Sequence, residues 1–105
     1  MHNHFENISF LSEDEQDEIK TIFITATVNF FEEFKQLYTQ ENSSLLRKKC
    51  HTFGSSLMVF KLDECGVLLQ NISKELKLKN SANAYLMFLK LEKSVNTFID
   101  YIKKP

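Results

Sequence analysis

The chain has 105 residues, 43% of them hydrophobic and 26% charged, a balance typical of one globular domain with a single core. The formal net charge is −1 and no basic stripe offsets it, so we expect no nucleic-acid partner. Neither a signal peptide nor an apolar run of about 18 residues is present, so we expect a cytoplasmic protein with no membrane segment. Two glycines and one terminal proline leave few helix breakers, which favours long helices joined by short polar links.

Residues 1–11 show no clear hydrophobic period, and we interpret them as an N-terminal arm that precedes a domain at residues 12–104. Phe5, Ile8 and Leu11 are spaced so that they could form one apolar turn over an end of the core. His2 and His4 suggest a metal site, but two histidines near a terminus without further ligands seldom form one. We therefore expect a frayed or lightly docked arm and no bound metal.

The first long helix is predicted to begin after Ser12 and to run to about Gln40. Ser12 and Glu15 fit a capping box, with the serine as N-cap and the glutamate at N3. Ile24, Phe31 and Tyr38 widen its apolar stripe, so this helix should contact more than one neighbour. The stripe itself, spaced by threes and fours, consists of Ile19, Ile22, Phe23, Ala26, Phe30, Phe34 and Leu37.

A second helix is predicted from an N-cap at Asn42 to about Phe60, and it carries a histidine on its polar face. Its apolar face consists of Leu46, Cys50, Phe53, Leu57 and Phe60. At about 100° per residue, His51 points about 140° away from the centre of that face, toward solvent. Arg47 and Lys48 lie one turn before His51, Ser55 lies one turn after it, and Met58 follows two turns after it.

Two further amphipathic helices complete the chain. Lys61–Glu64 is predicted to connect to a third helix, whose apolar face is Cys65, Leu68, Leu69, Ile72 and Leu76. After a polar link at Lys77–Asn80, with Asn80 or Ser81 as cap, the fourth helix presents Ala84, Phe88, Leu91, Val95, Phe98 and Ile102. Four such helices predict an all-α, antiparallel up-down-up-down four-helix bundle. Cys50 and Cys65 fall on apolar faces, so we expect both to be reduced and buried.

An exposed histidine in the second long helix of a four-helix bundle resembles a histidine-containing phosphotransfer (HPt) domain, and the resemblance covers about Ile19 to Ile102. The family pattern is a small residue, His, two residues, Lys, Gly and further small residues. Residues 50–56, Cys-His-Thr-Phe-Gly-Ser-Ser, match the small residue, the histidine, the Thr-Phe pair and the small run. Asn42 stands nine residues before the histidine, where the family usually has a capping Asp.

The chain departs from this pattern in two places. Gly54 stands at the family's lysine position and Ser55 at its glycine position. The glutamate that commonly ends the motif of the third helix is also absent, since Ser73 follows Ile72. Introducing a gap to realign the glycine would turn Leu57 and Phe60 off the core face by about 100°, so we prefer the ungapped alignment.

The resemblance implies a phosphorelay intermediate of two-component signalling, in which His51 takes a phosphoryl group from one receiver aspartate and passes it to another. Such a protein is a stoichiometric carrier with no turnover site and no cofactor of its own, because the partner receiver brings Mg²⁺. The implied partners are receiver domains of response regulators or a hybrid histidine kinase, and we expect the carrier to be a monomer. The residues expected to support the phosphoryl group are Lys48, Arg47, Thr52 and Ser55, and those expected to dock the partner are Gly54, Met58, Val59 and Leu62.

Alternatives remain open at this level. Loss of the family lysine is compatible with a degenerate HPt-like adaptor that binds receiver or kinase domains without efficient transfer. A structural or cofactor-binding bundle is disfavoured because no Glu-x-x-His pair faces inward at ligand spacing. Gly54 serves either close helix packing or partner access, and Gly66 is expected to serve packing.

Overall fold

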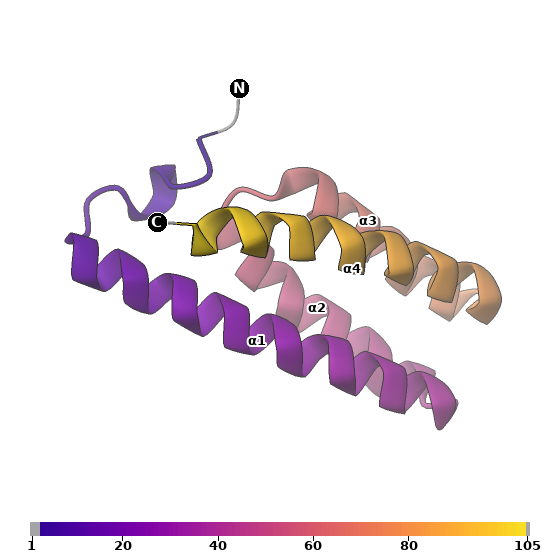
Figure 1. The fold of residues 1–105 in the computed structure, drawn as a ribbon. Coiled ribbons are helices and arrows are strands. Elements are labelled where there is room, and N and C mark those ends of the chain that lie inside the picture. Colours follow the sequence, from indigo (N-terminus) through magenta and orange to yellow (C-terminus); the bar gives the residue numbers. More distant parts are fainter. Residues whose placement is uncertain (1–2, 105) are drawn as a thin grey trace.

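The computed structural model of the protein describes residues 3–104, which fold as a four-helix bundle with a short arm at one end (Figure 1). A 3₁₀ turn, η1 (Glu6–Ile8), precedes α1 (Glu13–Thr39), α2 (Ser43–Val59), α3 (Asp63–Lys77) and α4 (Ser81–Lys103). Consecutive helices run antiparallel, and the most extensive contacts are those of α3 with α2 and with α4. The predicted all-α bundle is confirmed. Within residues 3–104, no helix has the length and apolar character needed to cross a membrane.

The predicted caps start the first two helices. The Ser12 hydroxyl accepts a hydrogen bond from the Glu15 N–H (3.2 Å), and the Glu15 carboxylate accepts one from the Ser12 N–H (3.1 Å). The bond from the Ser12 backbone also lowers the pKa of Glu15. At α2, the Asn42 side chain accepts from the Leu45 N–H at 3.2 Å. The capping box and the Asn42 cap are therefore confirmed.

Three helices end in the same tight turn although no glycine stands there. Glu41, Lys61 and Lys79 follow α1, α2 and α3 with φ of 57°, 54° and 63°, the left-handed region that glycine adopts most readily. The backbone N–H after each of them donates to a carbonyl of the preceding helix, in the bonds Asn42 to Leu37, Leu62 to Leu57 and Asn80 to Glu75. The chain therefore makes its sharp reversals with ordinary residues.

Phenylalanine rings dominate the core. Phe53 of α2 stacks on Phe30 of α1 with ring centroids 4.3 Å apart, and Phe34 of α1 stacks on Phe88 of α4 at 3.9 Å. The expected core face of α2 is confirmed, since each of its members, Leu46, Cys50, Phe53, Leu57 and Phe60, is at most 4% exposed. This burial fixes the rotation of α2 about its axis and directs His51 outward.

The apolar stripe of α1 differs from the expectation at two positions. Ile22 is 63% exposed, because it lies about 100° round the helix from the buried Phe23 and no neighbouring helix covers that flank. Thr27 takes a place in the core that the hydrophobic pattern does not reveal. Its hydroxyl donates to the Phe23 carbonyl at 2.8 Å, which satisfies the only strong donor that its burial removes from water.

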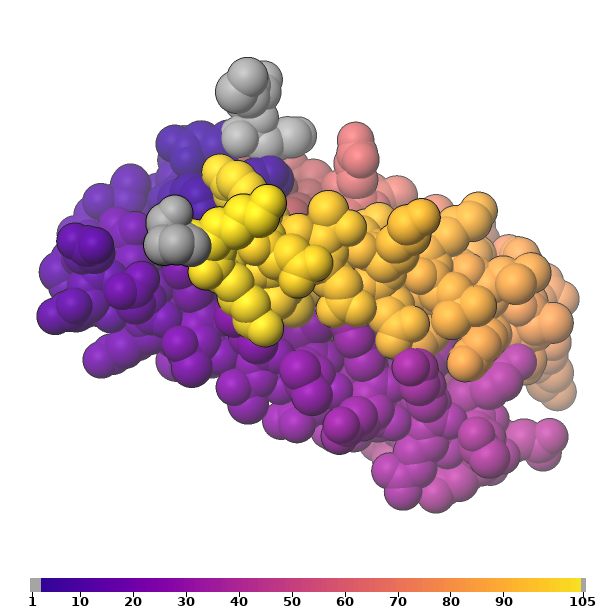
Figure 2. Space-filling view, in the orientation of Figure 1, coloured from indigo at the N-terminus to yellow at the C-terminus, as the bar shows by residue number. Residues whose placement is uncertain are grey.

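The described part of the arm, residues 3–11, packs closely on the bundle rather than fraying. Ile8 is buried, and the Phe5 ring lies near those of Phe60 and Tyr101. His4 Nδ1 is 2.9 Å from the Phe60 carbonyl oxygen, and Glu6 pairs with Lys61 at 2.7 Å. Figure 2 shows the indigo arm against the yellow C-terminal part of α4. The predicted apolar turn over an end of the core is confirmed, whereas His2 lies outside the described residues.

Truncating a core residue of α2 tests this rotation. We expect Leu57→Ala to lower the free energy of unfolding by about 2–5 kcal/mol, because it opens a cavity in a close-packed interior. Ser55→Ala, on the exposed face of the same helix, should change it by less than about 0.5 kcal/mol. Urea denaturation followed by circular dichroism measures both, and a neutral Leu57→Ala would contradict the orientation of α2.

Candidate functional site

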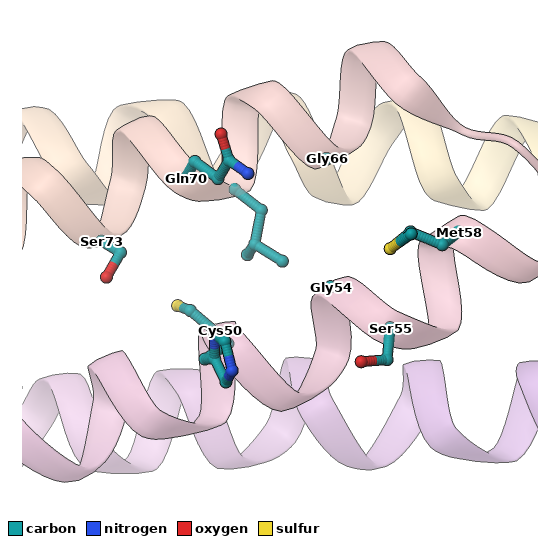
Figure 3. A pocket seen from close by; sticks show the side chains of 9 residues that line it. Cys50, Gly54, Ser55, Met58, Gly66, Gln70 and Ser73 are labelled. Atoms are coloured by element: carbon teal, nitrogen blue, oxygen red, sulfur yellow. The ribbon is translucent and has the colours of Figure 1, made fainter.

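His51 is exposed on α2 and borders a groove of about 340 Å³ between α2 and α3. One wall of the groove consists of Cys50, His51, Gly54, Ser55 and Met58 of α2. The other wall consists of Gly66, Leu69, Gln70 and Ser73 of α3. Figure 3 shows Cys50 and Met58 on one side of this gap and Gln70 and Ser73 on the other. The histidine predicted from the sequence therefore stands beside an open surface depression.

Both glycines of the chain line this groove, and helix packing requires neither of them. A Cβ added at Gly54 would lie 3.8 Å from Leu69 Cδ2, an ordinary van der Waals contact. A Cβ added at Gly66 would have no atom within 4 Å. The expectation that Gly66 serves packing is wrong, because a side chain at this position would extend into open space. Gly54 was expected to serve either close helix packing or partner access. The ordinary contact distance removes the support for close packing.

Cations stand near His51 on the same helix. Between Ser43 and Val59, α2 carries three basic residues and no acidic one. Lys48 is exposed, and it has no ion-pair partner among residues 3–104. Arg47 is half-buried, and its Nε is buried without a hydrogen-bond partner. Lys49 instead turns to α1, where it pairs with Glu33 at 2.7 Å. Arg47 and Lys48 therefore carry positive charge on the helical turn that precedes His51.

The two hydroxyl residues predicted to support a phosphoryl group lie in different places. Ser55 is exposed and lines the groove beside His51. Thr52 lines a separate shallow depression between α1 and α2, and its hydroxyl donates to the Lys48 carbonyl at 3.1 Å. The structure therefore places Thr52 and Ser55 in different depressions of α2, and the role of Thr52 stays a prediction.

Three apolar residues were expected to dock a partner, and only one of them is freely accessible. Met58 is 70% exposed at one end of the groove, and its backbone carbonyl accepts a hydrogen bond from Asn7 of the arm. Val59 is half-buried against the core. Leu62 is buried at the start of α3 and closes the end of the bundle, so its assignment as a docking residue is wrong. Val67, which is 57% exposed next to Gly66, provides an accessible apolar side chain that the sequence did not single out.

Gln70 and Ser73 complete the groove from α3, and sequence reasoning missed them. Both are polar residues on the flank of a helix, which is an ordinary position for a solvated side chain. The helical spacing does place Gly66, Gln70 and Ser73 on one strip. Which strip of α3 lies opposite His51 depends on the register between α2 and α3. The hydrophobic pattern of either helix alone does not contain that register.

Neither thiol is activated, and no metal centre is formed by residues 3–104. Burial raises the pKa of Cys50 from 9.0 to about 12, so the sulfur beside His51 is a neutral wall of the groove. Burial, and secondarily the charge of Glu64, also raises the pKa of the half-buried Cys65. In the described part of the chain, no group of three or more His, Cys, Asp or Glu side chains is placed to hold a metal ion.

Comparisons of the chain with known protein families, with curated proteins and with solved structures find no match. What the site can do chemically follows from His51 and its neighbours. An imidazole offers a nucleophilic ring nitrogen, and no side chain that lines the groove is a carboxylate that could act as a base. Because no base from the groove assists it, this nucleophile suits a co-reactant that already carries a good leaving group.

The buried thiol next to His51 gives a pH-dependent prediction. Because folding raises the pKa of Cys50, its contribution to stability is complete below pH 9.0 and is lost as pH rises toward about 12. The slope is up to about 1.4 kcal/mol per pH unit for one proton. The free energies of unfolding of wild type and Cys50→Ala should therefore converge across this window. Parallel curves would contradict the buried, neutral thiol. Cys65→Ala gives the comparison with a thiol that is only half-buried and whose pKa is also raised.

Proposed function

We propose that this protein carries phosphoryl groups between receiver domains of a two-component phosphorelay, with His51 as the phosphoacceptor. The observation that carries the proposal is an exposed histidine on the polar face of a rigid bundle helix, beside a groove without an acidic lining residue. The resemblance of residues 50–56 to the HPt pattern supports the same chemistry. A fixed, accessible imidazole is what a carrier needs, because its partner must reach the reacting nitrogen.

The transfer step needs little from this chain. A ring nitrogen of His51 attacks the phosphorus of an aspartyl phosphate on the receiver, and the bond between phosphorus and the aspartyl oxygen breaks. The aspartate leaves as a carboxylate, and the phosphorylated imidazolium releases the proton of its other ring nitrogen to water. The receiver supplies Mg²⁺, which neutralises the charge on the phosphoryl oxygens. The reverse reaction on a second receiver completes the relay.

Nearby donors can stabilise the phosphorylated ring. Lys48 and Arg47 lie one helical turn before His51, and Ser55 lies one turn after it. Charge-assisted contacts from the two cations would offset the negative charge that the phosphoryl group adds. Gly54 stands where HPt domains have a lysine. We therefore assign the role of that lysine, which is to offset the phosphoryl charge, to the two cations on the preceding turn of α2. Gln70 and Ser73 offer further donors from α3.

The proposal implies a defined setting for the protein. Its partners are receiver domains, alone or as part of a hybrid histidine kinase, which places it in the cytoplasm. It works as a monomeric, stoichiometric carrier and binds no cofactor of its own. Specificity then depends on the surface around His51, since the imidazole itself cannot distinguish one receiver from another.

A second candidate function follows from Gly54. Without a lysine at this position, the bundle would also suit an adaptor that occupies a receiver or kinase surface without efficient transfer. Incubation with receivers phosphorylated by acetyl phosphate, followed by an assay for acid-labile phosphate, separates the two. Tight binding without phosphate uptake by the wild type would favour the adaptor over the carrier.

Replacement of the acceptor gives the primary prediction. His51→Gln should abolish phosphoryl uptake from a phosphorylated receiver, because the amide nitrogen of glutamine is not nucleophilic. The side chain is exposed, so the melting temperature should stay within a few degrees of the wild type. Equal uptake by both proteins would exclude His51 as the acceptor.

Lys48 should prolong the lifetime of phosphorylated His51, but phosphorylation itself should not require it. We expect Lys48→Ala to shorten the lifetime of phosphorylated His51 by up to about fivefold, because an exposed contact is worth about 1 kcal/mol or less. Lys90→Ala, at an exposed position of α4, is the matched control and should have no effect. Lifetimes should be measured at low and high salt, and an effect of Lys48→Ala that salt does not weaken would contradict an electrostatic role.

A further inference from the structure

We propose that the groove between α2 and α3 receives an apolar side chain of the receiver domain and thereby selects which receiver reacts with His51. We call it the two-glycine groove, after Gly54 and Gly66, which lie on its opposite walls. This inference rests on the proposed function and adds a recognition site to it. Its basis is the placement of the two glycines, the space that they leave and the charges at either end.

The glycines stand where helix stability disfavours them. Gly54 and Gly66 are the only glycines of the chain, and both lie inside helices, where glycine is less stable than alanine. Glu41, Lys61 and Lys79 occupy the left-handed positions at which glycine would relieve strain. The distribution is therefore the reverse of the one that folding alone would favour.

Packing within the chain does not explain this placement. An alanine Cβ at Gly66 would meet no atom within 4 Å, and one at Gly54 would make only an ordinary contact with Leu69. Alanine would therefore fit at both positions without displacing a neighbour. What glycine adds at both positions is room in the groove beside His51, and that room benefits only a molecule that enters it.

The lining indicates the chemistry of the occupant. Leu69, 3% exposed, and the exposed Met58 provide apolar surface, while polar side chains such as Gln70 and Ser73 stand toward the other end. None of the lining residues is a Lys, Arg, Asp or Glu, so a charged side chain that entered would lose water without gaining an ion pair. An apolar side chain is therefore the occupant that the groove favours.

Charges around the groove favour an acidic surface on the receiver and give it an orientation. Arg47 and Lys48 precede the groove on α2, and Lys74 and Lys77 follow Gln70 and Ser73 on α3. Within residues 3–104, none of these four cations forms an ion pair. The first turn of α3, with Asp63 and Glu64, makes the opposite end acidic. The apolar side chain should therefore be flanked by carboxylates that face the basic end.

Filling the groove without disturbing the fold tests the inference. Gly66→Leu places a branched side chain in open space on a helix, so its melting temperature should equal or exceed that of the wild type. Asn71→Leu is the matched control, because it adds the same side chain to an exposed site of α3 away from the groove. The probes are the receiver domains of the source organism, phosphorylated with acetyl phosphate in Mg²⁺, and phosphoramidate as a donor that needs no docking.

With the receiver that phosphorylates wild type fastest, Gly66→Leu should lower the transfer rate and raise the Kd at least tenfold. Gly66→Ala should have a smaller effect in the same direction, and Asn71→Leu should have none. Direct phosphorylation of His51 by phosphoramidate should be equal in all four proteins. Loss of both reactions in a folded Gly66→Leu protein would overturn a docking role, because the imidazole itself would then be impaired.

Three further outcomes would overturn the inference in distinguishable ways. Equal receiver transfer by wild type and Gly66→Leu would remove the groove from recognition and leave the proposed function standing. Failure of every receiver to phosphorylate the wild type would reject the proposed function and the inference together. Sedimentation of wild type and Gly66→Leu identifies another occupant, since a dimer lost in the variant would assign the groove to a second copy of this chain.

Discussion

The stacking of Phe53 on Phe30 and the burial of its neighbours on α2 fix the rotation on which the rest of the site depends. A turn of α2 by about 100° would expose two or three of its large apolar side chains, each worth about 1.5–3 kcal/mol of burial. His51 therefore has one direction available to it. The imidazole is held outward by the aromatic core behind it, and no hydrogen bond at the site is needed to explain that orientation.

The same core allows the helices to carry residues that local propensity disfavours. Gly54 and Gly66 weaken the interiors of α2 and α3 by roughly 1 kcal/mol each relative to alanine. Glu41, Lys61 and Lys79 hold left-handed turns without glycine. Ring contacts join nine of the ten phenylalanines, from three helices and the arm, and such contacts can offset these losses, whereas Phe10 is exposed. The fold can therefore tolerate residues near His51 that do not add to its stability.

Periodicity in the sequence was enough to predict the fold and the outward direction of His51, because both follow from which side chains must be buried. It did not predict the exposure of Ile22 or the burial of Leu62, which depend on where neighbouring helices end. The groove depends on the register of α2 against α3, which periodicity does not contain. The sequence pattern therefore reveals neither that Gln70 and Ser73 line the groove nor that space is open at Gly66. Thr52 lies in a different depression from His51, because adjacent residues on a helix point about 100° apart.

Locating the phosphoryl group on the wild-type chain decides whether His51 is the phosphoacceptor. After incubation with phosphorylated receivers and Mg²⁺, ³¹P NMR and fragmentation at neutral pH can assign the modified residue. We expect a phosphorus–nitrogen bond on the imidazole of His51, labile in acid, and none on His2 or His4. A phosphoryl group on another residue, or no phosphoryl group after exposure to every receiver of the source organism, would contradict it.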